Sequence, residues 1–313
     1  MFEFIMKRAF SVIPVGFGVI TLVSLMIHFI PGDPIDILLG DFATMEEKIL
    51  MQKALGLHLP WWRQCSNYIL GVLTGDLQQS LIYQEPVLSL IGERILPTVE
   101  LAVISVFVAI ILSIPLGVSA AIRKGHAFDM ISMTFALLAV AMPNFWLGPM
   151  LILLFSLKLG FLPVSENIGF TSFILPSITI GTSLAAILAR MTRNSMLEVL
   201  KEDYIRTARS KGLSEKLIIV KHAFRNASLP VTSVLGLQLG ALLTGSVITE
   251  KVFDWPGLGT LMLEALGNRD YPLIQGCVLI FSLSYLCINL LTDIIYAVID
   301  PRIKVTGLGN GKS

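Results

Sequence analysis

The residues whose type and spacing suggest chemistry most directly stand at the end of the sequence. Residues 306–313 read TGLGNGKS, which approaches the phosphate-binding loop GxxxxGK[ST], where backbone amides and a lysine cradle nucleotide phosphates. Thr306 replaces the required first glycine, no strand precedes the segment, and the sequence stops where the phosphate-binding helix would begin. We therefore expect residues 303–313 to be a flexible tail without a nucleotide site.

The cysteines and histidines do not form the pattern of a metal or redox site. The three cysteines are Cys65, Cys277 and Cys287, with no CxxC pair and no metal-ligand spacing, and the four histidines are scattered. No nucleophile is paired with a base, and no His/Glu cluster or acidic dyad occurs in the apolar stretches. We expect no catalytic, cofactor or metal site in this chain.

The distribution of charge is the strongest signal. Six stretches contain no Asp, Glu, Lys or Arg, namely 9–32, 101–122, 130–157, 167–189, 226–249 and 271–292. Each is long enough for a helix to cross a hydrocarbon core, which takes about 20 residues. An ionised residue at the centre of such a helix costs roughly 2.5–3.5 kcal/mol. The pattern predicts an all-α membrane protein with six transmembrane helices.

The basic residues predict the orientation of these helices. With six spans, both termini lie on one side, and the segments of that side hold 16 of the 23 Lys and Arg residues. Because cytoplasmic loops are enriched in Lys and Arg, we expect both termini in the cytoplasm. A transmembrane helix over 1–32 then precedes an outer loop, 33–97, and a transmembrane domain, 98–302.

The outer loop has two features. Thr44 and Glu47 have the spacing of a capping box and predict an amphipathic helix ending near Gly56. Residues 59–62, LPWW, form an aromatic cluster typical of the headgroup level. A loop folded onto the outer membrane surface and a small soluble subdomain both fit.

Several residues inside the spans could shape a pathway. Pro143 and Pro149 interrupt the third span beside Asn144, and an interrupted helix either lines a cavity or is packed in an ordinary bundle. Polar amides in hydrocarbon need partners or water, so the candidate pathway residues are Asn144, Gln238 and Asn289. Gly236 and Gly240 are four residues apart and favour close helix packing.

The longest inner segment, 191–231, predicts helix, turn and helix. Apolar residues recur at helical spacing on both sides of Gly212, which is a typical helix stop, and Ser214 is a candidate N-cap for the second helix. On composition alone, a basic face lying on anionic lipid is the favoured interpretation, because basic inner loops are the rule.

Longer motifs favour a different role. The segments are 202–213 (EDYIRTARSKGL), 222–230 (HAFRNASLP), 252–259 (VFDWPGLG), 268–272 (NRDYP), 300–303 (DPRI) and 29–34 (FIPGDP). In their order along the chain, these segments resemble the permease subunits of dipeptide, oligopeptide and nickel importers, which belong to the type I ABC importers. Their EAA loop corresponds to 191–231, although Arg206 and Thr207 replace its Glu and first Ala.

The resemblance implies a non-catalytic permease that spans the lipid bilayer of a bacterial inner membrane and forms a heterodimer with a homologous second permease. Two ABC ATPase subunits would bind ATP and Mg²⁺, and a periplasmic binding protein would deliver substrate; nucleic acid plays no part. Contact with the ATPases would involve Tyr204, Arg206, Thr207, Ala208 and Gly212. Dipeptides or oligopeptides are the expected cargo, with nickel or a nickel chelate as the alternative.

Two other classes compete. A secondary transporter needs ionisable residues at mid-membrane or polar sites in repeated halves, and an intramembrane enzyme needs a catalytic constellation. Activity of the isolated chain would favour either class.

Overall fold

A computed structural model describes residues 2–26, 35, 44–54, 56, 58–164 and 169–299. The expected tail and the motifs at 29–34 and 300–303 lie outside these residues. The described part contains helices and no strand. The helices are α1 (Phe2–Met26), α3 (Met45–Ala54), α4 (Trp61–Thr74), α5 (Val87–Ile122), α6 (Ala127–Ala141), α7 (Asn144–Leu151), the π-helix η1 (Ile152–Lys158), α8 (Thr171–Val199), α9 (Asp203–Ser210), α10 (Glu215–Leu217), the π-helix η2 (Ile218–Ala223), α11 (Phe224–Val252), α12 (Leu258–Gly267) and α13 (Tyr271–Ile299).

Three of these helices are long and apolar enough to cross a membrane: Val87–Ile122, Thr171–Val199 and the part of α13 up to Ile294. A fourth span results if α6 and the α7–η1 segment count as one, although they are bent by 104°. α1 contributes a shorter apolar helix, Phe10–Met26. The described part of each uncharged sequence run is almost entirely helical, but the count of six spans stays a prediction.

The bend falls at the proline that the sequence suggested. Met142 and Pro143 are extended, with ψ angles of 117° and 143°, because the residue before a proline is excluded from the helical region. Pro149 does not interrupt α7, which continues and widens into η1 from Ile152. One proline therefore breaks the segment, and the other does not.

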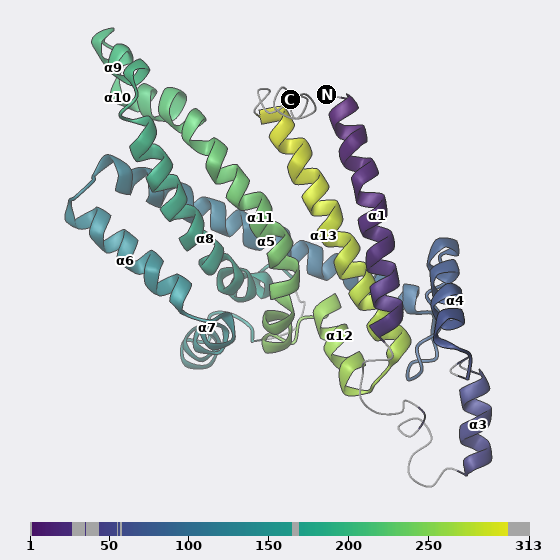
Figure 1. Cartoon of the computed structure of the whole chain (residues 1–313). Coiled ribbons are helices and arrows are strands. Elements are labelled where there is room, and N and C mark those ends of the chain that lie inside the picture. Colours follow the sequence, from purple (N-terminus) through teal and green to yellow (C-terminus); the bar gives the residue numbers. More distant parts are fainter. Residues whose placement is uncertain are drawn as a thin grey trace. The chain divides into compact units, whose positions relative to one another are not determined.

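The chain forms two compact units. The first contains 100–255 together with the segment from Ile288 onward. Its central pair is α8 and α11, which run side by side (Figure 1). Their shared core includes Leu101, Leu184 and Leu188, and is closed by the edge-to-face contact of Phe173 and Trp255, whose ring centroids are 4.6 Å apart.

Glycine permits a close approach of α11 and α13 within this unit. A Cβ atom built on Gly236 would lie 2.0 Å from Cγ2 of Thr292, whose side chain is buried. Since real atoms cannot approach this closely, any side chain at this position requires the two helices to shift. Gly240, one turn further along α11, is also buried.

The second unit contains 5–99 and 256–287. Its core joins α4, α5, α12 and α13 through residues such as Tyr68, Ile91, Leu261 and Leu273. Asp270 is fully buried and accepts hydrogen bonds from the Ser80 hydroxyl and from the amide of Leu273, which it caps at the start of α13. The aspartate of the NRDYP motif therefore fixes the 80–83 turn to α13.

The predicted capping box is present at the start of α3. The Thr44 amide and hydroxyl donate to Oε2 of Glu47 over 2.8 and 2.9 Å, and these bonds lower the pKa of the Glu47 carboxyl. α3 ends at Ala54, two residues before Gly56, which has a left-handed φ of +69°. Trp61 and Trp62 are exposed at the start of α4, whereas Cys65 is buried.

Candidate functional site

The turn at Gly212 is built by a helix-ending motif. Gly212 has a φ of +75°, its amide donates to the carbonyl of Arg209 over 2.9 Å, and the Leu213 amide donates to the carbonyl of Ala208 over 3.4 Å. These two bonds define a Schellman motif with glycine at the left-handed position. Nothing lies within 4 Å of a Cβ built on Gly212, so the backbone conformation, not space, requires glycine here.

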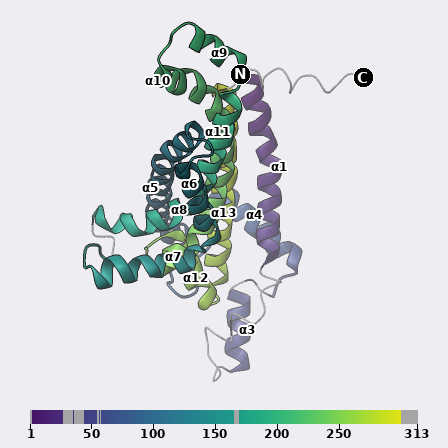
Figure 2. The same ribbon diagram turned by 90° about the vertical axis from the view of Figure 1, so that its left-hand side faces the viewer.

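The segment 203–223, which we call the elbow, projects beyond the ends of α8 and α11 (Figures 1 and 2). It has its own small core. Ile205 of α9 and Ile218 of η2 are fully buried, and they pack with Ala208 and with Met196 of α8. The elbow is therefore a packed helical body and not a loose connection.

Polar side chains hold the two sides of the elbow together. The Arg209 guanidinium donates to both carboxylate oxygens of Glu215, over 2.8 and 3.4 Å, and so spans the turn. The Asn226 amide donates to the Tyr204 hydroxyl over 2.7 Å and connects α9 to α11. Both pairs are exposed, so they add little stability each but fix the geometry of the elbow.

The five residues expected to contact another protein do not share one environment. Arg206, Thr207 and Gly212 are exposed, and Tyr204 keeps 41% of its surface accessible. Ala208 is 8% exposed and belongs to the core of the elbow. The small size of Ala208 thus serves packing within the chain, whereas the other four residues are available at its surface.

The helix pattern before the turn is interrupted where we expected continuity. α8 ends at Val199, Glu202 is extended with a ψ of 146°, and α9 begins at Asp203. Ser214 occupies the predicted N-cap position of α10, but its side chain makes no capping hydrogen bond. The first helix of the predicted pair is therefore two helices joined by a short break.

A buried ion pair, which sequence reasoning missed, fixes the end of α8 near the elbow. Asp129 of α6 is 3% exposed and accepts bonds from Nε and Nη2 of Arg193 at 2.5 and 2.7 Å. The Gly125 amide donates to the same carboxylate over 2.9 Å. Asp129 lies just before one uncharged run and Arg193 just after another, but nothing in the sequence pairs them.

A small polar cleft lies at the α6–α7 bend. It has a volume of about 150 Å³, and its lining includes Asn144, Ser183 and Gln238 among leucines and isoleucines. The Ser183 hydroxyl donates to Oδ1 of Asn144 over 2.8 Å. Two predicted pathway residues, Asn144 and Gln238, therefore line the same cleft, and Ser183 is hydrogen-bonded to the first of them. Asn289 is half-buried on α13 and is not part of this lining.

The described residues contain no group of three or more His, Cys, Asp or Glu side chains that could hold a metal ion. The polar cleft carries amides and a hydroxyl, which can form hydrogen bonds with a passing polar molecule. The elbow presents an exposed, rigid surface to a partner. Neither arrangement contains the parts of a catalytic site.

Two family descriptions match almost the whole chain. Residues 113–305 match the family described as binding-protein-dependent transport system inner membrane component, and residues 1–102 match its N-terminal companion. The glutathione transport system permease protein GsiC of Escherichia coli strain K12 is 42% identical over 304 residues, covering 97% of this chain and 99% of GsiC. GsiC of Salmonella typhi matches with the same identity and coverage.

Solved structures show the same fold. Two crystal forms of the methionine ABC transporter MetNI in inward-facing conformations contain a chain that superposes with a TM-score of 0.57. The sequence identities are 18% and 19%, and the match covers 67% of this chain and 96% of the other.

Proposed function

The chain belongs to the family of binding-protein-dependent transport system inner membrane components, and on that premise we propose that it passes short peptides across the membrane, driven through its elbow. Membership of this family establishes the general role of the chain. The chain is a non-catalytic permease subunit of a binding-protein-dependent ABC importer, with the all-α fold of type I importers. ATP hydrolysis takes place in partner subunits, and a substrate-binding protein supplies such permeases.

The elbow is the proposed contact with the ATPases. Its tip exposes Arg206, Thr207 and Gly212, while its inner face is packed against the end of α8. A surface element that has its own core can transmit a displacement without unfolding. We assign ATP and Mg²⁺ to two ATPase subunits, which grip this element, and we place a homologous second permease beside this chain.

The cargo is proposed from the relatives. The 42% identity with GsiC, a permease of a glutathione transport system, extends over almost the full length of both chains, and this observation carries the assignment of a peptide-like cargo. The polar cleft formed by Asn144, Ser183 and Gln238 offers amide and hydroxyl groups suited to a peptide backbone. Nickel or a nickel chelate is the competing cargo of the same architecture.

Reconstitution tests both parts. The permease, its sister subunit, two ATPases and the binding protein are placed in proteoliposomes, and ATPase stimulation and uptake are measured with glutathione, dipeptides, longer peptides and nickel. We expect stimulation by peptides. Stimulation by nickel alone would replace the proposed cargo, and uptake by the chain without ATPases would contradict the elbow mechanism.

A charge-reversal variant tests the contribution of the elbow separately in the same assay. Arg206→Glu is expected to reduce peptide-stimulated ATPase activity and uptake together, because it changes the exposed tip without disturbing the core of the elbow. Lys53→Glu on α3 is the matched control, since Lys53 is also exposed but lies far along the chain from the elbow. Equal losses in both variants would argue against a specific contact.

Cysteine labelling tests the proposed cytoplasmic position of the elbow and both termini. Native Cys65 is buried and unsuitable, so Asn67→Cys and Ser210→Cys, both at exposed positions, are made in a Cys287→Ser background. An impermeant maleimide should label Asn67→Cys in intact cells and Ser210→Cys only after permeabilisation. The reverse pattern would invert the topology.

A further inference from the structure

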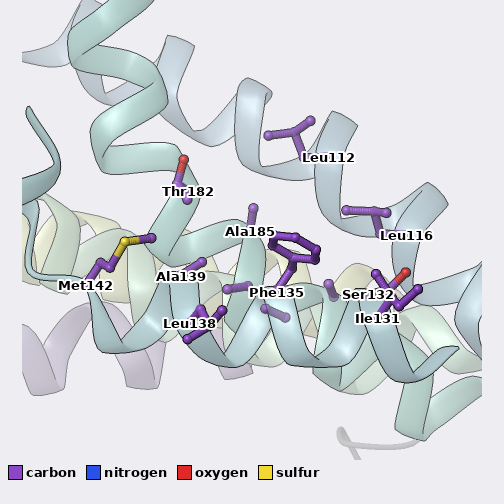
Figure 3. A pocket seen from close by; sticks show the side chains of 13 residues that line it. Leu112, Leu116, Ile131, Ser132, Phe135, Leu138, Ala139, Met142, Thr182 and Ala185 are labelled. Carbon is purple, nitrogen blue, oxygen red and sulfur yellow. The ribbon is translucent and has the colours of Figure 1, made fainter. Parts of the chain in front are cut away.

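An apolar groove of about 550 Å³ lies between α5, α6 and α8 (Figure 3). Leu112 and Leu116 of α5 form one wall, and Ile131, Phe135 and Leu138 of α6 form the other. Ala185 of α8 lies at the floor, where its short side chain leaves the space open. α5 and α8 are candidate membrane-spanning helices, and α6 is the first half of the bent candidate span.

The side chains that line the groove are almost all apolar. Thr182 and Ser132 are the polar side chains of its lining, and the Thr182 hydroxyl already donates to the carbonyl of Ile178 over 2.6 Å. Inside a membrane such a surface gains nothing from a polar cargo, because the cargo would lose its own hydrogen bonds to water. The occupant of this groove is therefore apolar along most of its length.

One end of the groove is cationic. Arg123 lies just beyond Ile122, where α5 ends, in the short turn that connects α5 to α6, the two walls of the groove. Its guanidinium lies 5.0 Å from the ring centre of Phe128, which is one turn before Ile131 on α6. Lys124 is exposed beside it.

Among the described residues, Asp129 supplies the carboxylate that interacts with this positive end, through Lys124. The nearby carboxylate of Asp129 is engaged by Arg193 and by the Gly125 amide. Arg123 and Lys124 therefore place two positive charges in the turn at the end of an apolar groove, beside a single carboxylate whose hydrogen bonds are already made. A ligand that matches both parts has an anionic head and a long hydrocarbon chain.

We propose that this groove binds one anionic phospholipid, with an acyl chain along α5 and α6 and the phosphate at Arg123 and Lys124. The predicted orientation places the headgroup in the cytoplasmic leaflet. A helix of another protein fits less well, because a helix about 10 Å across would fill 550 Å³ within about 7 Å of its length, little more than one turn. An apolar helix would also offer no anionic group to Arg123 and Lys124.

Lipid retention in the assembled transporter tests this proposal, and the readout does not depend on the cargo. The complex is reconstituted in nanodiscs of equal parts phosphatidylglycerol and phosphatidylcholine and is then analysed by native mass spectrometry. We expect one phosphatidylglycerol to be retained. Each neutralised basic residue should weaken this binding roughly fivefold, equivalent to about 1 kcal/mol, so that Arg123→Gln with Lys124→Gln weakens it about 30-fold.

Two further variants separate the parts of the site. Ala139→Trp fills the groove and should abolish retention, while Lys158→Gln removes an exposed cation at the end of η1 and should leave retention unchanged. Thermal melting confirms that each variant is folded. If the Arg123→Gln and Lys124→Gln double variant does not fold, Lys124→Gln alone is used to measure lipid retention. Equal retention of both lipids, or unchanged retention in Ala139→Trp, would overturn the proposal. Loss of the sister permease from Ala139→Trp, with the lipid still bound, would show a protein interface instead.

Discussion

Gly212→Ala is the most informative perturbation of the elbow. The φ of +75° places this residue in the left-handed region, where a side chain with a Cβ costs roughly 1–2 kcal/mol per residue. Nothing lies within 4 Å of the new methyl group, so this backbone cost is the whole expected effect. It should shift the local opening of the turn about 5- to 30-fold.

Hydrogen exchange of the Leu213 amide measures that opening directly, because this amide donates to the carbonyl of Ala208 only while the Schellman motif is closed. We expect its exchange in Gly212→Ala to accelerate about 5- to 30-fold, in proportion to the cost of the left-handed conformation. In reconstituted transporters, uptake per ATP hydrolysed should fall, since the elbow no longer keeps one shape when it is pushed.

Gly212→Asn is the matched control. Asparagine tolerates the left-handed region, so this variant adds a larger side chain than alanine while keeping the turn. We expect near-normal exchange and coupling. If Gly212→Asn lost coupling while Leu213 stayed protected, a partner would be sensing bulk at this position, and the conformational argument would be refuted.

Three other perturbations test the surrounding structure. Asp129→Asn removes the carboxylate partner of Arg193, whose side chain is 21% exposed, and should destabilise the protein by about 1–3 kcal/mol, measured by denaturation in detergent; an unchanged stability would mean that the pair is effectively solvated. Gly236→Ala overpacks the α11–α13 contact and should cost about 1–3 kcal/mol, whereas Gly92→Ala, with no atom within 4 Å of the new methyl, should be neutral or stabilising; similar losses at both would contradict the close approach. The hydrogen bonds from the Thr44 amide and hydroxyl lower the pKa of Glu47, so their contribution to α3 is present above the ordinary value of 4.5 and lost as the pH falls through the lowered native value. Thr44→Ala removes the hydroxyl bond but keeps the amide bond, so an NMR titration should show a partial rise of the Glu47 pKa, and an unchanged value would exclude the hydroxyl as a cause.

The sequence predicts the membrane helices and the turn because these depend on local signals. Absent charge over about 20 residues predicts helix in a bilayer, and a glycine between two periodic segments predicts a stop. The break at Glu202 carries neither a proline nor a glycine. It exists because α9 folds back to bury Ile205 against η2, which is a tertiary effect that the local pattern does not contain.

The same distinction applies to the candidate site. Asn144 and Gln238 stand out as amides within apolar runs, but the cleft that joins them, and the addition of Ser183, depend on how α7, α8 and α11 pack. The pairing of Asp129 with Arg193 spans 64 positions in the sequence. Residue type identified the candidates, and only the three-dimensional arrangement identified which of them meet.

The two ends of the elbow differ in stiffness. Toward α8 the chain passes through the extended Glu202, where rotation about a few backbone bonds absorbs movement. Toward α11 the backbone stays helical from Ile218 through Ala223 and Phe224 without interruption. A force applied at the tip would therefore reach α11 through continuous helical backbone, whereas it would reach α8 across the extended Glu202 and through the packing of Met196 against the elbow.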